Sequence, residues 1–124
     1  MTEKKISALV IEDDADAAFI SQKAMTDNGY DVTVITRGDE AAEQLKVLTP
    51  DVILLDLHLP NVAGIDLLKQ IRSSEHLADT RVVLVTADPR TAQTLEHDAD
   101  MTLLKPVTYS QVRGLVGRLL KKIQ

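Results

Sequence analysis

Five polar side chains each stand at the end of a short apolar run, or directly after one, and each run has the length of a buried strand. They are Glu12, Asp13, Asp56, Thr86 and Lys105. If these runs are parallel strands of one sheet, their C-terminal ends lie along one edge, where open α/β sheets bind ligands. The pattern therefore predicts one pocket that holds three carboxylates, a hydroxyl and an ammonium group.

This set of groups is suited to phosphoryl chemistry. Three carboxylates without cysteine form a hard-oxygen site of the kind that Mg²⁺ prefers. A carboxylate beside a divalent ion can attack phosphorus and become an aspartyl phosphate, and Asp56 is the candidate nucleophile. The ammonium of Lys105 would neutralise phosphoryl oxygens, and the Thr86 hydroxyl would donate a hydrogen bond to one of them.

Each residue also has an ordinary structural explanation. Asp is frequent in turns and Thr in strands, and Lys105 could be a surface lysine before a turn proline. The acidic run that begins at Glu12 could be a solvated turn that caps the next helix, with Asp14 or Asp16 as the N-cap. The joint occurrence at four strand ends favours the functional interpretation over these separate ones.

Hydrophobic periodicity predicts alternating strands and helices. The strands are expected at residues 6–11, 31–35, 51–56, 81–85 and 101–104, and the helices at 15–28, 38–48, 65–73, 90–98 and 108–123. On the first helix, Ala17, Ile20 and Ala24 are expected to face the core. Thr108 and Gln111 match a capping box. Five βα units predict an α/β fold with a five-stranded parallel sheet covered by helices on both faces.

Composition limits the function further. The chain has 124 residues, 44% of them hydrophobic, which fits one domain over residues 1–124. The net charge of −5 argues against direct nucleic-acid binding. The sequence has no cysteine, no run long enough to cross a membrane and no signal peptide, so we expect a cytoplasmic protein without a membrane partner.

The motifs together resemble the receiver domain of two-component response regulators. They are Val10-Ile11-Glu12-Asp13-Asp14, Leu54-Leu55-Asp56-Leu57-His58-Leu59-Pro60 with Gly64, Val85-Thr86-Ala87 and Leu104-Lys105-Pro106. The resemblance implies a doubly wound, flavodoxin-like sheet of strand order 2-1-3-4-5. It implies that Asp56 is the phosphoacceptor, and that Glu12, Asp13, Asp56 and the backbone carbonyl of His58 bind Mg²⁺. It also implies that Thr86 and Lys105 contact the phosphoryl group and that the Lys105–Pro106 bond is cis.

Two features depart from the family pattern. Receivers usually carry an aromatic residue three positions before the lysine, where this chain has Thr102, and Tyr109 beyond the proline is not an evident substitute. The segment from Thr86 to Lys105 is short, and Asp98-Ala99-Asp100 replaces the usual Gly-Ala pair. We therefore expect a shortened or irregular fourth helix and an unusual output face.

The resulting prediction is a signalling module, not an enzyme, that takes a phosphoryl group from a histidine kinase or phosphotransfer protein. Its downstream protein target is open, and a monomer or weak homodimer is expected. One alternative is an interaction or dimerisation scaffold that is never phosphorylated. Another is an Mg²⁺-dependent phosphohydrolase, although His58 stands where such enzymes place a second Asp.

The remaining histidines and the basic residues of the last helix suggest no second site. The side chain of His58 would either contact an attacking water or lie solvated at the pocket rim. His76 and His97 are expected to be surface residues, and the cations of the last helix are expected to form its solvated face. These cations are Arg113, Arg118, Lys121 and Lys122.

Overall fold

The computed structural model describes residues 5–60, 62–95 and 97–123. The strands are β1 (Ser7–Ile11), β2 (Asp31–Ile35), β3 (Val52–Asp56), β4 (Arg81–Thr86) and β5 (Met101–Leu104). The helices are α1 (Ala15–Asp27), α2 (Gly38–Gln44), α3 (Gly64–Ser73), the 3₁₀ turn η1 (Glu75–Leu77), α4 (Pro89–Thr94) and α5 (Tyr109–Ile123). All strand pairs are parallel in the order β2-β1-β3-β4-β5, so the predicted fold is confirmed.

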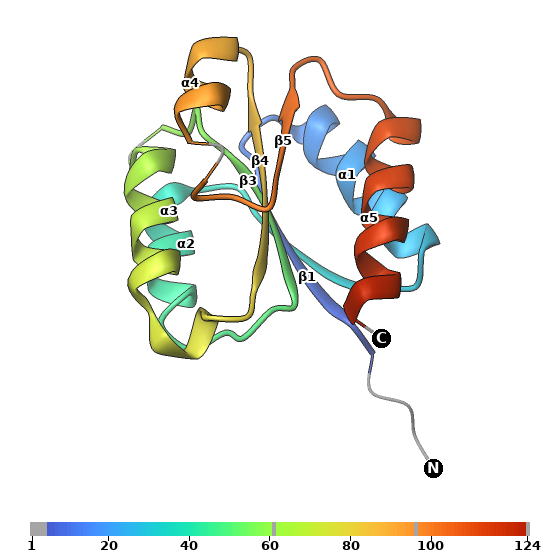
Figure 1. Ribbon diagram of the computed structural model, residues 1–124, viewed down its shortest axis with the longest axis horizontal. Helices are drawn as coiled ribbons and strands as arrows, with labels where there is room; N and C mark the ends of the chain where they lie inside the picture. The colour runs from blue at the N-terminus through green and yellow to red at the C-terminus, as the bar shows by residue number, and fades with distance from the viewer. Residues whose placement is uncertain (1–4, 61, 96, 124) are drawn as a thin grey trace.

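Helices cover both faces of the sheet. Figure 1 shows α1 and α5 on one side and α2, α3 and α4 on the other. Every residue of β3 is buried, which is expected of a central strand whose two faces both meet helices. Successive residues of β1 alternate between the two cores: Leu9 and Ile11 join the α2–α3 side, and Ala8 and Val10 join the α1–α5 side.

Two helix starts follow the predicted capping chemistry. The Asp14 carboxylate accepts the Ala17 N–H at 3.0 Å, so Asp14 rather than Asp16 is the N-cap of α1. At α5 the Thr108 N–H donates to Gln111 Oε1 at 2.9 Å, and the Gln111 N–H donates to Thr108 Oγ1 at 3.1 Å. The capping box is therefore formed in both directions.

Several local predictions are wrong in detail. The buried residues of α1 are Ala18, Ser21, Ala24 and Met25, so the inward face is displaced from the predicted one; Ala17 and Ile20 are only half-buried. Because Ser21 is polar, hydrophobic periodicity does not identify it as part of the buried face. Helix α2 ends at Gln44 rather than Leu48, since the Lys46 and Val47 amides bond three residues back, to the Glu43 and Gln44 carbonyls at 3.2 and 3.1 Å.

His76 is exposed, as predicted, but it also forms a hydrogen bond between two elements. Its Nε2 lies 2.8 Å from the carbonyl oxygen of Leu45, the residue that follows α2, and a carbonyl can only accept, so the imidazole donates. His76 belongs to η1, directly after α3, and thus ties the end of α3 to the end of α2. No hydrophobic pattern encodes this contact, because it joins residues far apart in the sequence.

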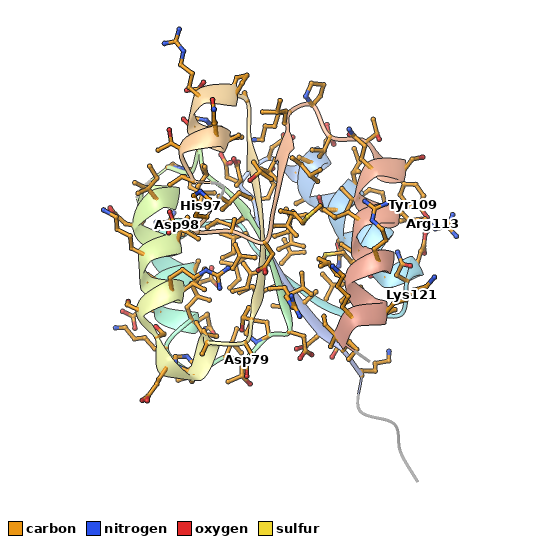
Figure 2. All side chains as sticks on the ribbon, in the orientation of Figure 1. Asp79, His97, Asp98, Tyr109, Arg113 and Lys121 are labelled. Carbon is orange, nitrogen blue, oxygen red and sulfur yellow. The ribbon has the colours of Figure 1, made fainter. Side chains whose placement is uncertain are left out.

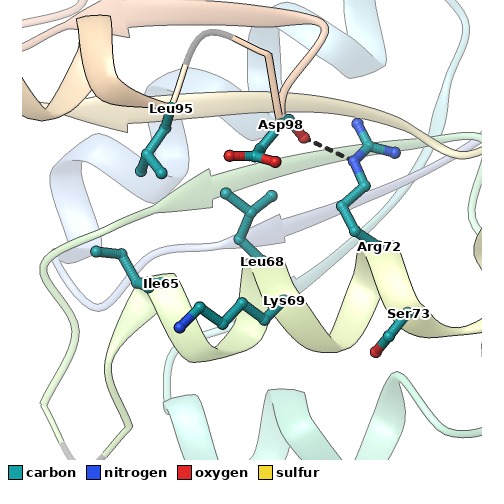
Figure 3. Close-up of a pocket in the computed structure, with 7 residues that line it drawn as sticks. All are labelled: Ile65, Leu68, Lys69, Arg72, Ser73, Leu95 and Asp98. Atoms are coloured by element: carbon teal, nitrogen blue, oxygen red, sulfur yellow. Dashed lines mark hydrogen bonds between the residues drawn. The ribbon is translucent and has the colours of Figure 1, made fainter.

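Helix α4 is short, as predicted, but its predicted C-terminal half is not helical. It ends at Thr94, and none of its six residues, all described by the structure, is buried. The chain beyond it is held by α3: Arg72 Nε donates to the Asp98 carbonyl at 2.6 Å (Figure 3). Arg72 Nη2 also donates to the Asp100 carboxylate at 3.1 Å. That carboxylate accepts the Val82 N–H at 2.7 Å, so Arg72 fixes the entry into β5.

Within the described ranges, none of the helices is both long and apolar enough to cross a membrane.

Candidate functional site

Four neighbouring strands deliver the predicted side chains to one edge of the sheet. Glu12 directly follows β1, Asp56 ends β3, Thr86 ends β4, and Lys105 directly follows β5. The register places Asp56 beside Val85 and Thr86 beside Leu104, so the strand ends are level. Asp56 and Thr86 are fully buried and Glu12 is 2% exposed, whereas Asp13 lies at the surface.

The Asp56 carboxylate is held from two sides. Its Oδ1 accepts the backbone N–H of His58 at 3.0 Å. Its Oδ2 accepts a hydrogen bond from Lys105 Nζ at 3.0 Å, and the same ammonium lies 3.6 Å from Glu12 Oε1. The orientation of the carboxylate is therefore fixed before any ligand binds. The Lys105–Pro106 peptide bond is cis, as the resemblance implied.

Glu12, Asp13 and Asp56 form an acidic cluster able to hold a metal ion. One carboxylate oxygen from each lies within 4.8 Å of the others. All three donors are hard oxygens, and the exposed Asp13 leaves one side of the cluster open to solvent. Lys105 is the only cation in ion-pair contact with the cluster among the described residues, so the negative charges outnumber the positive one.

Burial and the neighbouring charges together shift the pKa values of the free site. Burial, followed by the hydrogen bond to Asp56 and its negative charge, raises the pKa of Glu12 from 4.5 to about 8. Burial lowers the pKa of Lys105, but the hydrogen bond to Asp56 and the charges of Asp56, Glu12 and Asp13 outweigh it, so the net shift is upward. A cation bound among the carboxylates would favour the ionised form of Glu12.

The Thr86 hydroxyl has two partners at the pocket. Its Oγ1 accepts the Asp88 backbone N–H at 3.1 Å and lies 3.3 Å from His58 Nε2. The contact with His58 was not predicted from the sequence, which placed the imidazole in contact with water or bulk solvent. The only sequence signal was that His58 follows Asp56 by two residues, and that spacing does not reveal a bond to another strand.

The residues that depart from the family pattern lie elsewhere. Thr102 is half-buried on β5. The Tyr109 hydroxyl donates to the Asp27 carboxylate at the end of α1, so its ring is engaged on the α1–α5 side (Figure 2). This hydrogen bond raises the pKa of Tyr109. Among the described residues, no tyrosine hydroxyl forms a hydrogen bond with Thr86.

The loop after β3 requires glycine at one position. A Cβ atom on Gly64, the first residue of α3, would overlap the backbone of Leu57. Only glycine allows this close approach. The approach packs the start of α3 against the loop that carries His58, and so helps to fix the His58 amide that binds Asp56.

Comparisons with known proteins agree with this geometry. A family model described as the response regulator receiver domain matches residues 8–116. The chain belongs to this family. Members are signalling modules rather than classical enzymes, and receiver domains have histidine kinases as partners. The DNA-binding response regulator MtrA of Mycolicibacterium paratuberculosis is 35% identical over 119 residues, which are 94% of this chain and 50% of MtrA.

Two solved receivers show the same fold. The chemotaxis response regulator CheY4 of Vibrio cholerae superposes with a TM-score of 0.84 at 22% identity, covering 94% of this chain and 99% of CheY4. The receiver domain of the sensor histidine kinase PA1611 from Pseudomonas aeruginosa, solved with magnesium in its active-site cleft, gives 0.81 at 22% identity, covering 93% and 97%. This receiver spans only 19% to 50% of the length of the curated relatives it matches.

Proposed function

We propose that this receiver is a cytoplasmic protein that accepts a phosphoryl group on Asp56 from a histidine kinase or phosphotransfer protein. The observation that carries the proposal is the setting of the Asp56 carboxylate. It is fully buried at the end of the central strand, 3.0 Å from the Lys105 ammonium and within the acidic cluster. A buried carboxylate with a cation on one side and two further carboxylates on the other is suited to covalent phosphoryl transfer.

The donor set fits Mg²⁺. Glu12, Asp13 and Asp56 offer hard carboxylate oxygens, and Mg²⁺ in proteins is held by few carboxylates and several waters. The backbone carbonyl of His58 is the further ligand that the family resemblance implies. Bound there, Mg²⁺ would supply positive charge to the phosphoryl oxygens. The magnesium reported for the PA1611 receiver supports this assignment.

The side chains of this receiver then have distinct parts in the transfer. An Asp56 oxygen forms the new bond to phosphorus while the bond from phosphorus to the donor's imidazole nitrogen breaks, and that nitrogen later takes up a proton. Lys105 Nζ already contacts Asp56 Oδ2, so its positive charge can stabilise the negative charge of the phosphoryl oxygens once they are bound there. Thr86 ends the neighbouring strand and would donate its hydroxyl proton to one of them.

Intact-mass spectrometry after incubation with acetyl phosphate, with and without Mg²⁺, tests this proposal. We expect the gain of one phosphoryl group that requires Mg²⁺ and is absent in Asp56→Asn. Asp66→Asn is the matched control, because Asp66 is an exposed carboxylate on α3 and its loss should leave the gain intact. A gain that persists in Asp56→Asn, or no gain in the wild-type protein despite Mg²⁺ binding, would reject the assignment and favour the scaffold function.

A further inference from the structure

The hydrogen bonds of Thr86 constrain where its proton lies. A hydroxyl has one proton to donate and two lone pairs with which to accept. One lone pair of Thr86 Oγ1 accepts the Asp88 N–H at 3.1 Å. The remaining partner is His58 Nε2 at 3.3 Å, and a neutral imidazole nitrogen either donates or accepts, depending on the tautomer. The two tautomers leave the hydroxyl proton in different places.

Burial decides between the two tautomers. If Nε2 carried the ring proton, it would donate to Thr86, and the hydroxyl proton would be left without an acceptor among the residues that the structure describes. Thr86 is fully buried, and buried polar groups are rarely left unpaired because this costs free energy. The consistent arrangement is that Thr86 donates to an unprotonated Nε2, and the ring proton lies on Nδ1.

We propose that His58 is a positioning residue that holds the Thr86 hydroxyl proton, and that this bond must break when Thr86 turns to a phosphoryl group on Asp56. The proposal rests on the function proposed above. The hydroxyl has a single proton, so it cannot donate to His58 and to a phosphoryl oxygen at once. The His58–Thr86 bond therefore opposes phosphorylation, and phosphorylation releases the imidazole.

Because His58 lies at the surface, the loss of its hydrogen bond to Thr86 changes the surface of the protein. Its backbone N–H binds Asp56 Oδ1 and its side chain binds Thr86, so one residue links the ends of β3 and β4. The residue as a whole is exposed, whereas both of its partners are fully buried. A change inside the pocket thus reaches the surface through His58. This route does not need an aromatic side chain at Thr102.

The first test is the tautomer of His58 in the unphosphorylated, metal-free protein. Long-range ¹H–¹⁵N spectra, recorded where the ring is neutral, distinguish a proton on Nδ1 from one on Nε2. We expect Nδ1 in the wild-type protein and a mixture of both tautomers in Thr86→Val, which lacks the hydroxyl. A proton on Nε2 in the wild-type protein would overturn the proposal, and so would a tautomer unchanged by Thr86→Val.

The second test measures the competition at equilibrium. Beryllium trifluoride, a stable phosphoryl analogue, is titrated in the presence of Mg²⁺. His58→Ala should bind it about five-fold more tightly than wild type, because no hydrogen bond has to break first. His58→Gln carries a side-chain carbonyl that can accept from Thr86, and it should restore the wild-type affinity.

The same titration in a Thr86→Val background separates the bond from other effects of the ring. There His58→Ala should leave the affinity unchanged, since the hydroxyl is absent. An equal gain in both backgrounds, or no gain in either, would overturn the proposal. If no variant binds the analogue and wild type is not phosphorylated, the proposed function fails instead, and with it the competition. The tautomer spectra would still show whether the bond exists.

Discussion

Helices α4 and α5 come immediately before and after the edge strand β5, but they are held in different ways. Helix α5 buries one face, whose buried residues are Val112, Leu115, Val116 and Leu119. Helix α4 lies on the opposite side of the sheet and buries none of its six residues, all of which the structure describes (Figure 1). Burial of apolar surface is the main source of stability, so α5 is part of the core and α4 is not.

Hydrogen bonds add to the difference in packing between α5 and α4. The Tyr30 hydroxyl donates to the Val116 carbonyl at 2.7 Å inside the core, and Asn28 Nδ2 donates to the Arg113 carbonyl at 3.0 Å. These bonds join α5 to the end of α1. The segment after α4 is held instead by Arg72, which contacts Asp98 and Asp100 near the surface.

Structural change is expected to cost the least free energy in α4, which also contacts the pocket. The amide of Asp88, the N-cap of α4, donates to the Thr86 hydroxyl, so the pocket is continuous with the least buried helix. Regions with little buried apolar surface open at low free energy. A rearrangement of Thr86 can therefore spread into α4 while α5 and α1 stay in place.

The largest expected difference is in the free energy of unfolding, between an alanine substitution in α5 and one directly after α4. Leu115→Ala in α5 removes a buried side chain and should lower the free energy of unfolding by about 3 kcal/mol. Leu95→Ala, directly after α4, removes a half-buried side chain and should cost less than about 1 kcal/mol. Urea unfolding monitored by circular dichroism measures both values. Equal losses would show that α4 is as firmly packed as α5.

Arg72→Ala should loosen the segment that leads into β5. It removes hydrogen bonds to the Asp98 and Thr80 carbonyls and to the Asp100 carboxylate. We expect a loss of about 1.5 kcal/mol and faster amide exchange at Val82, whose partner is that carboxylate. Lys69→Ala, also a cation on α3 but without such bonds among the described contacts, is the control. Unchanged exchange at Val82 would contradict this role of Arg72.

Tyr30→Phe should weaken the α1–α5 side by about 1 kcal/mol at neutral pH. Burial raises the pKa of Tyr30 from 10.0 to about 12. Between these values the unfolded chain loses the phenolic proton and the folded protein keeps it, so this contribution to stability is complete below pH 10 and is lost as the pH rises through 12. The stability difference between wild type and mutant should therefore shrink over this range. A constant difference would show that Tyr30 does not carry the effect.

The smallest expected difference in stability is between the loss of the α5 cap and the loss of the α4 cap. Thr108→Ala removes the capping box of α5 and should cost about 1 kcal/mol of global stability. Asp88→Ala removes the carboxylate that accepts the Arg90 N–H at 3.0 Å. Because α4 buries none of its residues, we expect it to open locally, so this change should cost less than about 0.5 kcal/mol globally while amide exchange in α4 accelerates. A global loss equal to that of Thr108→Ala would place α4 in the cooperative core.

Local rules account for most of the fold. Short apolar runs alternating with helical periodicity fix five parallel strands, because each pattern matches only one way of burying its side chains. Parallel topology then places Glu12, Asp56 and Lys105 at one edge without knowledge of any contact between them. The cap at Thr108 was predictable as well, and the cap of α1 was narrowed to Asp14 or Asp16, since capping involves residues only three positions apart.

What the sequence by itself determined is the set of groups at the pocket and the edge on which they gather. Only the tertiary structure decided how these groups are paired. The bond between His58 and Thr86 joins residues 28 positions apart, and the bonds of Arg72 to the segment before β5 are of the same kind. Such bonds depend on the rotamers and spacing of side chains from different elements, and hydrophobic periodicity carries no information about them.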